Sequence, residues 1–169
     1  MQSASAEIVA CIPALRRYAR GLTGSRDAAD DLVQDALERA WSRMALWQRR
    51  GDMRSWLFSI LHNRFVDRVR SQRATPEDPP GEDEVIVPVR ATQSDLLEVR
   101  DLDAALARLP PDQREVLLLV AVEQMKYEEV AATLKVPLGT VMSRLSRARE
   151  RLRAILEGRE TVSKLKVVK

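Results

Sequence analysis

The sequence predicts an all-α fold made of two small helical domains joined by an acidic, proline-rich linker. Its 169 residues include only six glycines, three Trp, two Tyr and two Phe, and long segments without glycine or proline are rich in Ala, Leu, Arg and Glu. Such segments favour helices, and their apolar residues recur at steps of three and four, as one face of a helix requires. One stretch, residues 75–94, breaks this pattern and divides the chain.

The first two expected helices span residues 7–22 and about 27–45. Apolar positions from Ile8 to Leu22 form a buried face on the first helix, and Ser25 is the expected N-cap of the second. On the polar side of the second helix, helical spacing brings together Asp31, Gln34, Asp35 and Glu38. This acidic strip is either an ordinary solvated surface or a docking face for a basic partner.

A tryptophan-bearing loop at 46–53 precedes a third expected helix at 53–73. The polar residues toward the end of this helix are Asn63, Arg64, Asp67, Arg68, Arg70 and Arg73. An Arg-rich helix beside an aromatic loop is a combination that proteins use to bind single-stranded nucleic acid. Trp41 and Trp56 are expected in the core. For Trp47, the sequence does not decide between a place in the core and a role in stacking on bases.

Residues 75–94 contain four prolines, five acids and one glycine, so a linker is expected there rather than a helix. Beyond it, helices are expected at about 95–108 and 113–124, with Asp112 as the cap of the second. The very apolar centre of that second helix should be the buried middle of the second domain. The basic segment 158–169 is expected to be a loosely ordered tail.

A helix-turn-helix is expected near the end of the chain. Residues 127–134 form a short amphipathic helix, Pro137 and Gly139 mark a turn, and a long helix follows at about 140–156. The long helix has an apolar stripe of Val141, Leu145, Ala148, Leu152 and Ile155, and a polar side of Thr140, Ser143, Arg144, Arg147 and Arg151. Arginine can donate two hydrogen bonds to guanine, so this side suits the DNA major groove. A solvated basic face is the ordinary alternative.

Composition excludes several classes of protein. The net charge is only +3, but two neutral or basic regions flank an acidic connector, and a local basic patch is what nucleic-acid binding needs. One cysteine and one histidine exclude an internal disulfide and a cysteine-cluster metal site, so no metal or other cofactor is expected. No apolar run approaches the roughly 18 residues of a membrane span, and no signal peptide is visible. A cytoplasmic protein without membrane insertion is expected.

Together these segments resemble the extracytoplasmic-function (ECF) sigma factors, the minimal branch of the bacterial sigma family. The resemblance rests on DDLVQDALERAW (30–41), RSWLFSILHNRFVDRVR (54–70), LPPDQREVLLL (109–119) and YEEVAATLKVPLGTVMSRLSRARERL (127–152), in matching order over about residues 8–157. It implies sigma domain two at 1–74, a linker at 75–94, sigma domain four at 95–157 and a basic tail at 158–169.

For the first domain, the resemblance implies contacts with RNA polymerase core and with the −10 promoter element. Asp31, Gln34 and Asp35 match positions that grip the clamp helices of the polymerase largest subunit. The loop and the third helix match the part that opens the duplex and holds a flipped base, where the candidate DNA contacts are Asn63, Arg64, Asp67 and Arg70. Unstacking a base costs about a few kcal/mol, which binding of the exposed strand must offset.

For the second domain, the resemblance implies reading of the −35 element as duplex DNA by Thr140, Ser143, Arg144 and Arg147. Met142 and Ser146 depart from residues that are common in relatives, so the −35 sequence itself is not carried over. The polymerase flap is a further expected contact, and the linker is expected to thread toward the polymerase active site. Control by an anti-sigma factor is also implied by the resemblance.

Two other classes of function compete with this interpretation. A stand-alone helix-turn-helix transcriptional regulator would use the second domain, but it leaves the 30–41 helix and the Arg/Trp element without a role. An enzyme is disfavoured because no Gly-rich phosphate loop, metal cluster or nucleophile–base motif is visible, so no catalytic residue is expected. The lone thiol of Cys11 is expected to be an inert helix residue rather than a redox sensor.

Overall fold

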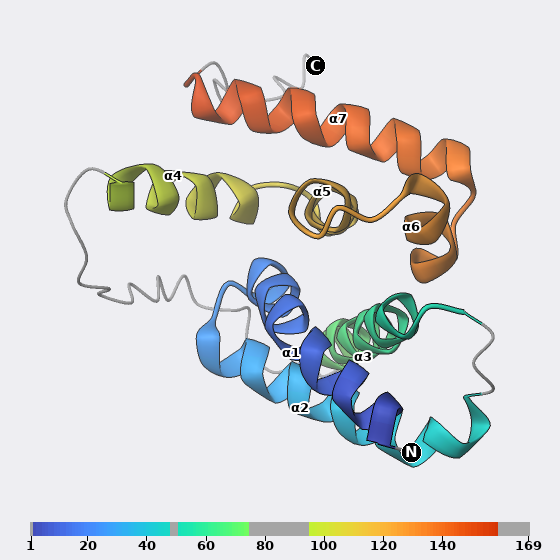
Figure 1. Ribbon diagram of the computed structural model, residues 1–169. Coiled ribbons are helices and arrows are strands. Elements are labelled where there is room, and N and C mark those ends of the chain that lie inside the picture. The colour runs from blue at the N-terminus through green and yellow to red at the C-terminus, as the bar shows by residue number, and fades with distance from the viewer. Residues whose placement is uncertain (1, 48–50, 75–94, 159–169) are drawn as a thin grey trace.

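The computed structural model describes residues 2–47, 51–74 and 95–158, and every regular element in these ranges is a helix (Figure 1). The all-α prediction is therefore confirmed. The first lobe consists of α1 (Gln2–Thr23), α2 (Arg26–Arg43), the short 3-10 helix η1 (Met44–Leu46) and α3 (Met53–Ala74). The second lobe consists of α4 (Asp95–Ala107), α5 (Pro111–Leu117), the π-helical turn η2 (Leu118–Val122), α6 (Tyr127–Leu134) and α7 (Leu138–Leu156). The expected linker and residues 159–169 of the expected tail lie outside the described residues.

The three long helices of the first lobe pack around one core, because α1 contacts α2 and α3, and α2 also contacts α3. Leu32 is fully buried there, and the rings of Tyr18 and Phe58 meet edge to face with centroids 5.3 Å apart. Ser25 caps α2 as predicted, since its Oγ accepts a hydrogen bond from the backbone N–H of Ala28 at 3.4 Å.

The tryptophans divide differently from the prediction. Placing Trp41 in the core is wrong: its side chain is 61% exposed. The buried stripe of α2 runs through Ala36 and Ala40, and Trp41 lies about 100° further round the helix, on the solvent side. Trp56 is partly buried against the core, and Trp47 packs beside it with ring centroids 5.9 Å apart and an interplanar angle of 29°.

In the second lobe, α4, α5 and α6 all contact α7. Val116 and Leu119 are fully buried, which confirms the predicted apolar centre, although Val122 at the end of the π turn is 46% exposed. The cap prediction was wrong. The N-cap is Pro110 and the helix begins at Pro111, where a missing N–H costs nothing, so Asp112 lies inside the first turn.

The turn before α7 is shorter than expected, because α7 begins at Leu138 rather than near residue 140. Lys135 adopts a left-handed conformation, with φ 55° and ψ 47°, and this conformation ends α6. Pro137 then serves as the N-cap of α7. The helix-turn-helix itself is present as predicted.

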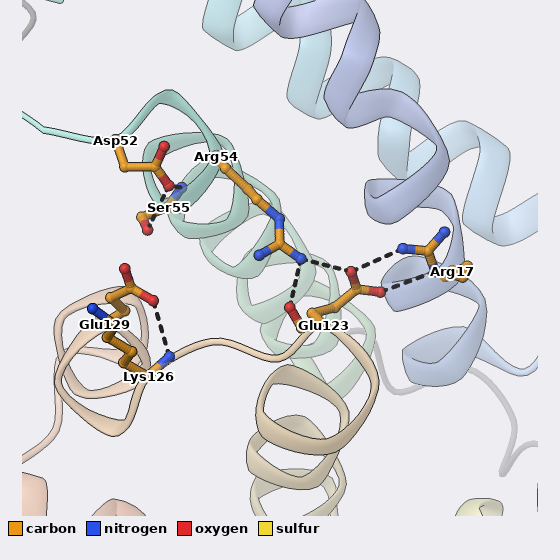
Figure 2. A network of polar contacts seen from close by, with 7 residues as sticks. All are labelled: Arg17, Asp52, Arg54, Ser55, Glu123, Lys126 and Glu129. Atoms are coloured by element: carbon orange, nitrogen blue, oxygen red, sulfur yellow. Dashed lines mark hydrogen bonds and ion pairs between the residues drawn. The ribbon is translucent and has the colours of Figure 1, made fainter.

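The two lobes lie against one another rather than apart, with α6 contacting α3 and with α5 and η2 contacting α1 (Figure 1). A Cβ on Gly21 of α1 would lie 2.6 Å from Leu118 Cδ1, so the helix surface approaches η2 closely at this point. Polar contacts also cross the boundary (Figure 2). Nothing in the sequence pattern indicated this association.

Candidate nucleic-acid and polymerase interface

The outer face of α3 brings together several of the predicted DNA contacts. Asn63, Asp67 and Arg70 are all exposed, and steps of three and four place them on one side of the helix. The same side continues toward the start of α3 through Ser59 and Trp56. A strand lying along this face would meet polar side chains over several turns of the helix.

An open hollow of about 720 Å³ lies at the N-terminal end of this face. Its first-lobe lining comes from the end of α2, from η1, from described residues between η1 and α3, and from the start of α3: Arg43, Leu46, Trp47, Gly51, Asp52, Ser55, Trp56 and Ser59. The stacked indoles of Trp47 and Trp56 form its aromatic wall, and the serine hydroxyls and the Asp52 carboxylate supply polar groups. The hollow thus offers both stacking and hydrogen bonding to a planar heterocycle.

Sequence reasoning left out Ser55 and Ser59. With Asn63, they repeat at four-residue spacing along α3, and this repeat was the available signal. The Asp52 carboxylate accepts hydrogen bonds from the backbone N–H and the hydroxyl of Ser55, at 3.1 and 3.2 Å. Asp52 therefore orients the first turn of α3 beside the hollow.

Asp35, from the predicted polymerase-binding site on α2, contacts arginines of the predicted −10 site on α3. Its carboxylate Oδ2 accepts a hydrogen bond from Arg64 Nη2 and another from Arg68 Nη2, each at 3.0 Å, so it joins α2 to α3. Hydrogen bonding from Arg64 is the largest influence on this carboxyl, and with Arg68 it holds the pKa of Asp35 below its ordinary value despite partial burial. Arg64 Nη1 also lies 3.8 Å from Asp67 Oδ2. Arg64 is thus shared between two carboxylates.

The predicted polymerase strip divides into two parts. Asp31 and Gln34 are exposed, and Gln34 donates a hydrogen bond to Glu38 at 3.4 Å along the surface of α2. Asp35 is half-buried and turned toward α3. Only the first two side chains present their polar atoms fully to a partner in this structure.

The recognition helix α7 presents its predicted residues unequally. Arg147 is exposed, whereas Thr140 and Ser143 are half-buried, with the Ser143 hydroxyl donating to the carbonyl of Thr140 at 3.2 Å. Arg144 is half-buried, and its Nε lies 3.5 Å from Asp112 Oδ2 at the start of α5. Arg144 is therefore tied to the lobe, while Arg147 points to solvent.

A second hollow, of about 430 Å³, lies along α7 on the side of the helix opposite to Arg144 and Arg147. Its lining includes Tyr127, Met142, Ser146, Arg149 and Arg153. The first turn of α7 contains no acid, so the positive end of the helix dipole is not neutralised there by a local carboxylate. Hydroxyls, arginines and this helix start make the outer side of α7 suitable for phosphate and base contacts.

Across 2–47, 51–74 and 95–158, no helix is long and apolar enough to span a membrane, and no three His, Cys, Asp or Glu side chains group as metal ligands. Burial raises the pKa of the Cys11 thiol, which favours its protonated, less reactive form.

Two protein families match separate parts of the chain. Residues 8–62 match the Sigma2 domain of PhyR, and residues 100–152 match Sigma-70, region 4. The ECF RNA polymerase sigma factor EcfG of Rhodopseudomonas palustris is 40% identical over 150 residues, covering 89% of this chain and 83% of that protein. SigE of Mycolicibacterium smegmatis is 38% identical over 148 residues, covering 83% of this chain and 56% of that protein.

Solved structures agree with these relationships. The sigma factor RpoE from Bartonella quintana, in complex with the anti-sigma factor NepR, aligns with a TM-score of 0.79 at 33% identity, covering 93% of this chain and 98% of that one. CnrH, in complex with the cytosolic domain of CnrY, aligns with a TM-score of 0.71 at 26% identity, covering 93% and 89%. The stand-alone regulator is not favoured by any of these relatives. The chain belongs to the extracytoplasmic-function family of RNA polymerase sigma factors.

Proposed function

We propose that this chain binds RNA polymerase core in the cytoplasm, directs it to promoters with −35 and −10 elements, and assists opening of the duplex, without catalytic activity of its own. Residues 1–74 would act as sigma domain two, 75–94 as the linker, 95–157 as sigma domain four and 158–169 as a basic tail. The observation that supports the proposal is that one chain combines two structural features, each of a kind that suits nucleic acid. One is a helix-turn-helix suited to duplex DNA, and the other is an aromatic hollow suited to an unstacked base.

In this proposal the −10 strand follows the outer face of α3. A base leaving the stack enters the hollow beside Trp47 and Trp56, where stacking offsets part of the unstacking cost. Asn63 contacts a base edge, and Arg70 contacts the backbone further along the helix. Arg64 and Asp67 act mainly through their ion pairs, because Arg64 is paired with Asp35 across α2 and α3 and with Asp67 within α3.

The −35 element is read by α7 in the major groove. Arg147 is the strongest candidate for a base contact because its side chain is exposed. Thr140 and Ser143 lie in the first turns of the helix, close to its positive end, where a phosphate is favoured. Arg144 orients α7 against α5 through Asp112 and contributes charge near the groove.

Core polymerase binds the exposed part of the acidic strip. Asp31 and Gln34 present polar atoms on the surface of α2, where a basic clamp helix would find them. Asp35 supports this contact from behind by fixing α2 to α3. The polymerase flap is the expected partner of the second lobe.

An anti-sigma factor is the expected regulator. RpoE, which shares this fold, was solved with the anti-sigma factor NepR, and CnrH was solved with the cytosolic domain of CnrY. The described part of this chain exposes large apolar side chains on both lobes: Val9, Trp41, Leu46, Leu102, Val122, Leu138, Met142 and Leu156. Exposed apolar groups on two lobes suit a partner that covers both.

Reconstitution with core polymerase tests the proposal. The holoenzyme should give promoter-dependent run-off transcripts, and sequencing of the DNA that it binds should yield two motifs separated by a constant spacing. Failure to bind core, together with tight binding of the free chain to a palindromic duplex, would refute the proposal.

A further inference from the structure

An apolar side chain is exposed in the second turn of the DNA-reading helix α7. Met142 is 52% exposed, and Leu138, one turn before it, is 41% exposed. Helices that read the major groove contact base edges mainly through residues near their N-terminal end. Met142 therefore lies where α7 meets the bases, although its side chain cannot form the hydrogen bonds that an arginine would form there.

Met142 lines the hollow of about 430 Å³ beside α7. The other apolar members of the lining are Tyr127, at the start of α6, and Leu145. Tyr127 packs against the hydrophobic core, and Leu145 is buried at 2% exposure. The inner part of the hollow is therefore apolar, and Met142 forms its exposed edge.

Three charged side chains complete the lining of this hollow. Arg149, Glu150 and Arg153 are all exposed, and none of them forms an ion pair with another residue that the structure describes. Two guanidinium groups and one carboxylate leave the rim with a net positive charge. Arg149 and Arg153 lie one turn apart on the same face of the helix, so the rim attracts the phosphates beside a base.

Helix geometry places the hollow and Arg147 on one continuous reading surface. Each residue advances about 100° around α7, so Met142 and Arg147 lie about 140° apart, with Ser146 between them. Ser146 and Arg147 are exposed as well. An α-helix fills the major groove, so side chains on both sides of its outermost line reach the DNA. Met142 and Arg147 can therefore contact different base pairs of one site.

A methionine at a base edge favours one chemical group. Its thioether donates no hydrogen bond and accepts one only weakly. Donors and acceptors on a base edge that are buried against Met142 lose their partners, which costs free energy. Thymine is the base that presents a methyl group, at C5, in the major groove, and burying this methyl group against Met142 and Tyr127 is favourable.

We propose that the hollow beside Met142 holds the C5 methyl group of one thymine in the −35 duplex, while Arg149 and Arg153 attract the neighbouring phosphates. The inference rests on the proposed −35 reading by α7 and adds to it the base that this chain prefers at one position. An arginine in place of Met142 would favour guanine there, because it could donate two hydrogen bonds to guanine O6 and N7. Met142 is thus a specificity-determining residue.

Uracil tests the contact because it lacks only the methyl group of thymine. The reconstituted holoenzyme first selects its upstream motif, which is found by sequencing the bound DNA. Each thymine of the motif, on either strand, is then replaced singly by deoxyuridine in competition binding assays. At one position the replacement should weaken binding about fourfold, which is the contribution of one buried methyl group.

Variants at position 142 identify the side chain that makes the contact. In Met142→Ala the sensitive thymine and its uracil replacement should bind within about 1.5-fold of each other, because the methyl group no longer meets the thioether. In Met142→Arg the preferred base at the same position should change from thymine to guanine.

Two kinds of control variant accompany these measurements. Leu156→Ala removes an apolar side chain of α7 that is 51% exposed but does not line the hollow, so the fourfold ratio should persist. Arg149→Ala and Arg153→Ala should weaken binding to all duplexes by the same factor. Each should also reduce the slope of log affinity against log salt concentration by about 0.9, as the loss of one phosphate contact requires.

The outcomes separate the methyl contact from the function on which it depends. A selected upstream motif in which no thymine is sensitive to uracil would overturn the methyl contact and leave the −35 reading in place. The same holds if the sensitivity persists in Met142→Ala. A holoenzyme that selects no upstream motif would overturn both the contact and the −35 reading.

Discussion

Replacing Asp35 by alanine separates the packing role of the acidic strip from its proposed polymerase contact. The substitution removes the acceptor of two hydrogen bonds from Arg64 and Arg68, each 3.0 Å long. The side chains in these pairs are about one-third exposed, at 33% for Asp35, 34% for Arg64 and 35% for Arg68. Solvent screening at this exposure leaves about 0.5 to 1 kcal/mol for each of the two pairs, so the free energy of unfolding should fall by roughly 1 to 2 kcal/mol.

Asp31→Ala is the matched control on the same helix. Its carboxylate is exposed, and a surface substitution of this kind changes stability by less than about 0.5 kcal/mol. If Asp31 touches polymerase, its removal should lower core affinity about fivefold to tenfold while the unfolding curve stays in place. Asp35→Ala should shift both measurements.

Urea unfolding and core titration by fluorescence anisotropy provide the two measurements. A double-mutant cycle with Arg68→Ala should return a coupling of about 0.5 to 1 kcal/mol. A coupling near zero would show that the bridge contributes nothing to the packing of α2 on α3. Full core affinity in Asp31→Ala would remove the exposed strip from the polymerase interface.

Acid should weaken the same bridge. Folding lowers the pKa of Asp35, so the ionised carboxylate stabilises the folded state fully at a pH above the ordinary pKa of 3.8. This stabilisation is lost as the pH falls through the lower pKa of the folded state. The free energy of unfolding, measured across an acid titration, should therefore show this loss in the wild type and not in Asp35→Ala. Arg147→Ala should weaken holoenzyme binding to −35 duplex DNA by about 1 to 3 kcal/mol in competition assays, whereas Arg144→Ala should also lower the melting temperature because its contact with Asp112 is lost. Equal effects of the two substitutions on binding and on melting would contradict the division of roles on α7. Asn63→Ala should reduce promoter opening, seen by permanganate footprinting, with core affinity unchanged; loss of core affinity would make the residue structural. Leu119→Ala empties a fully buried position and should lower the free energy of unfolding by about 2 to 5 kcal/mol in urea titrations, and a loss below 1 kcal/mol would contradict its place in the core.

Helices were predictable because their evidence is local. Apolar spacing along α7 placed Val141, Leu145 and Ala148 on one buried face, and the structure buries all of them. Ser25 and the glycine before it marked the start of α2 in the same way. Boundaries near proline were less secure, since Pro110 and Pro111 allow the helix to begin before the expected cap.

Contacts between helices were not predictable from these patterns. Asp35 and Arg64 lie on different helices, and periodicity along each helix does not define the angle or rotation that brings them together. The exposure of Trp41 has the same origin, because the buried face of α2 is formed by Ala29, Leu32, Val33, Ala36 and Ala40 and does not extend to Trp41. Glu123 was the least visible case, since one acid beside an apolar run looks like the end of a buried helix rather than an anchor for another lobe.

The close approach at Gly21 limits how freely the two lobes can be exchanged between related proteins. Any side chain at this position of α1 would press on Leu118, which lies in the other half of the chain. A chimaera that joins the first lobe of one relative to the second lobe of another would bring together residues at these positions that were never matched. The tolerance of α1 to change is therefore set partly by η2, and recombined sigma factors would need both positions transferred together.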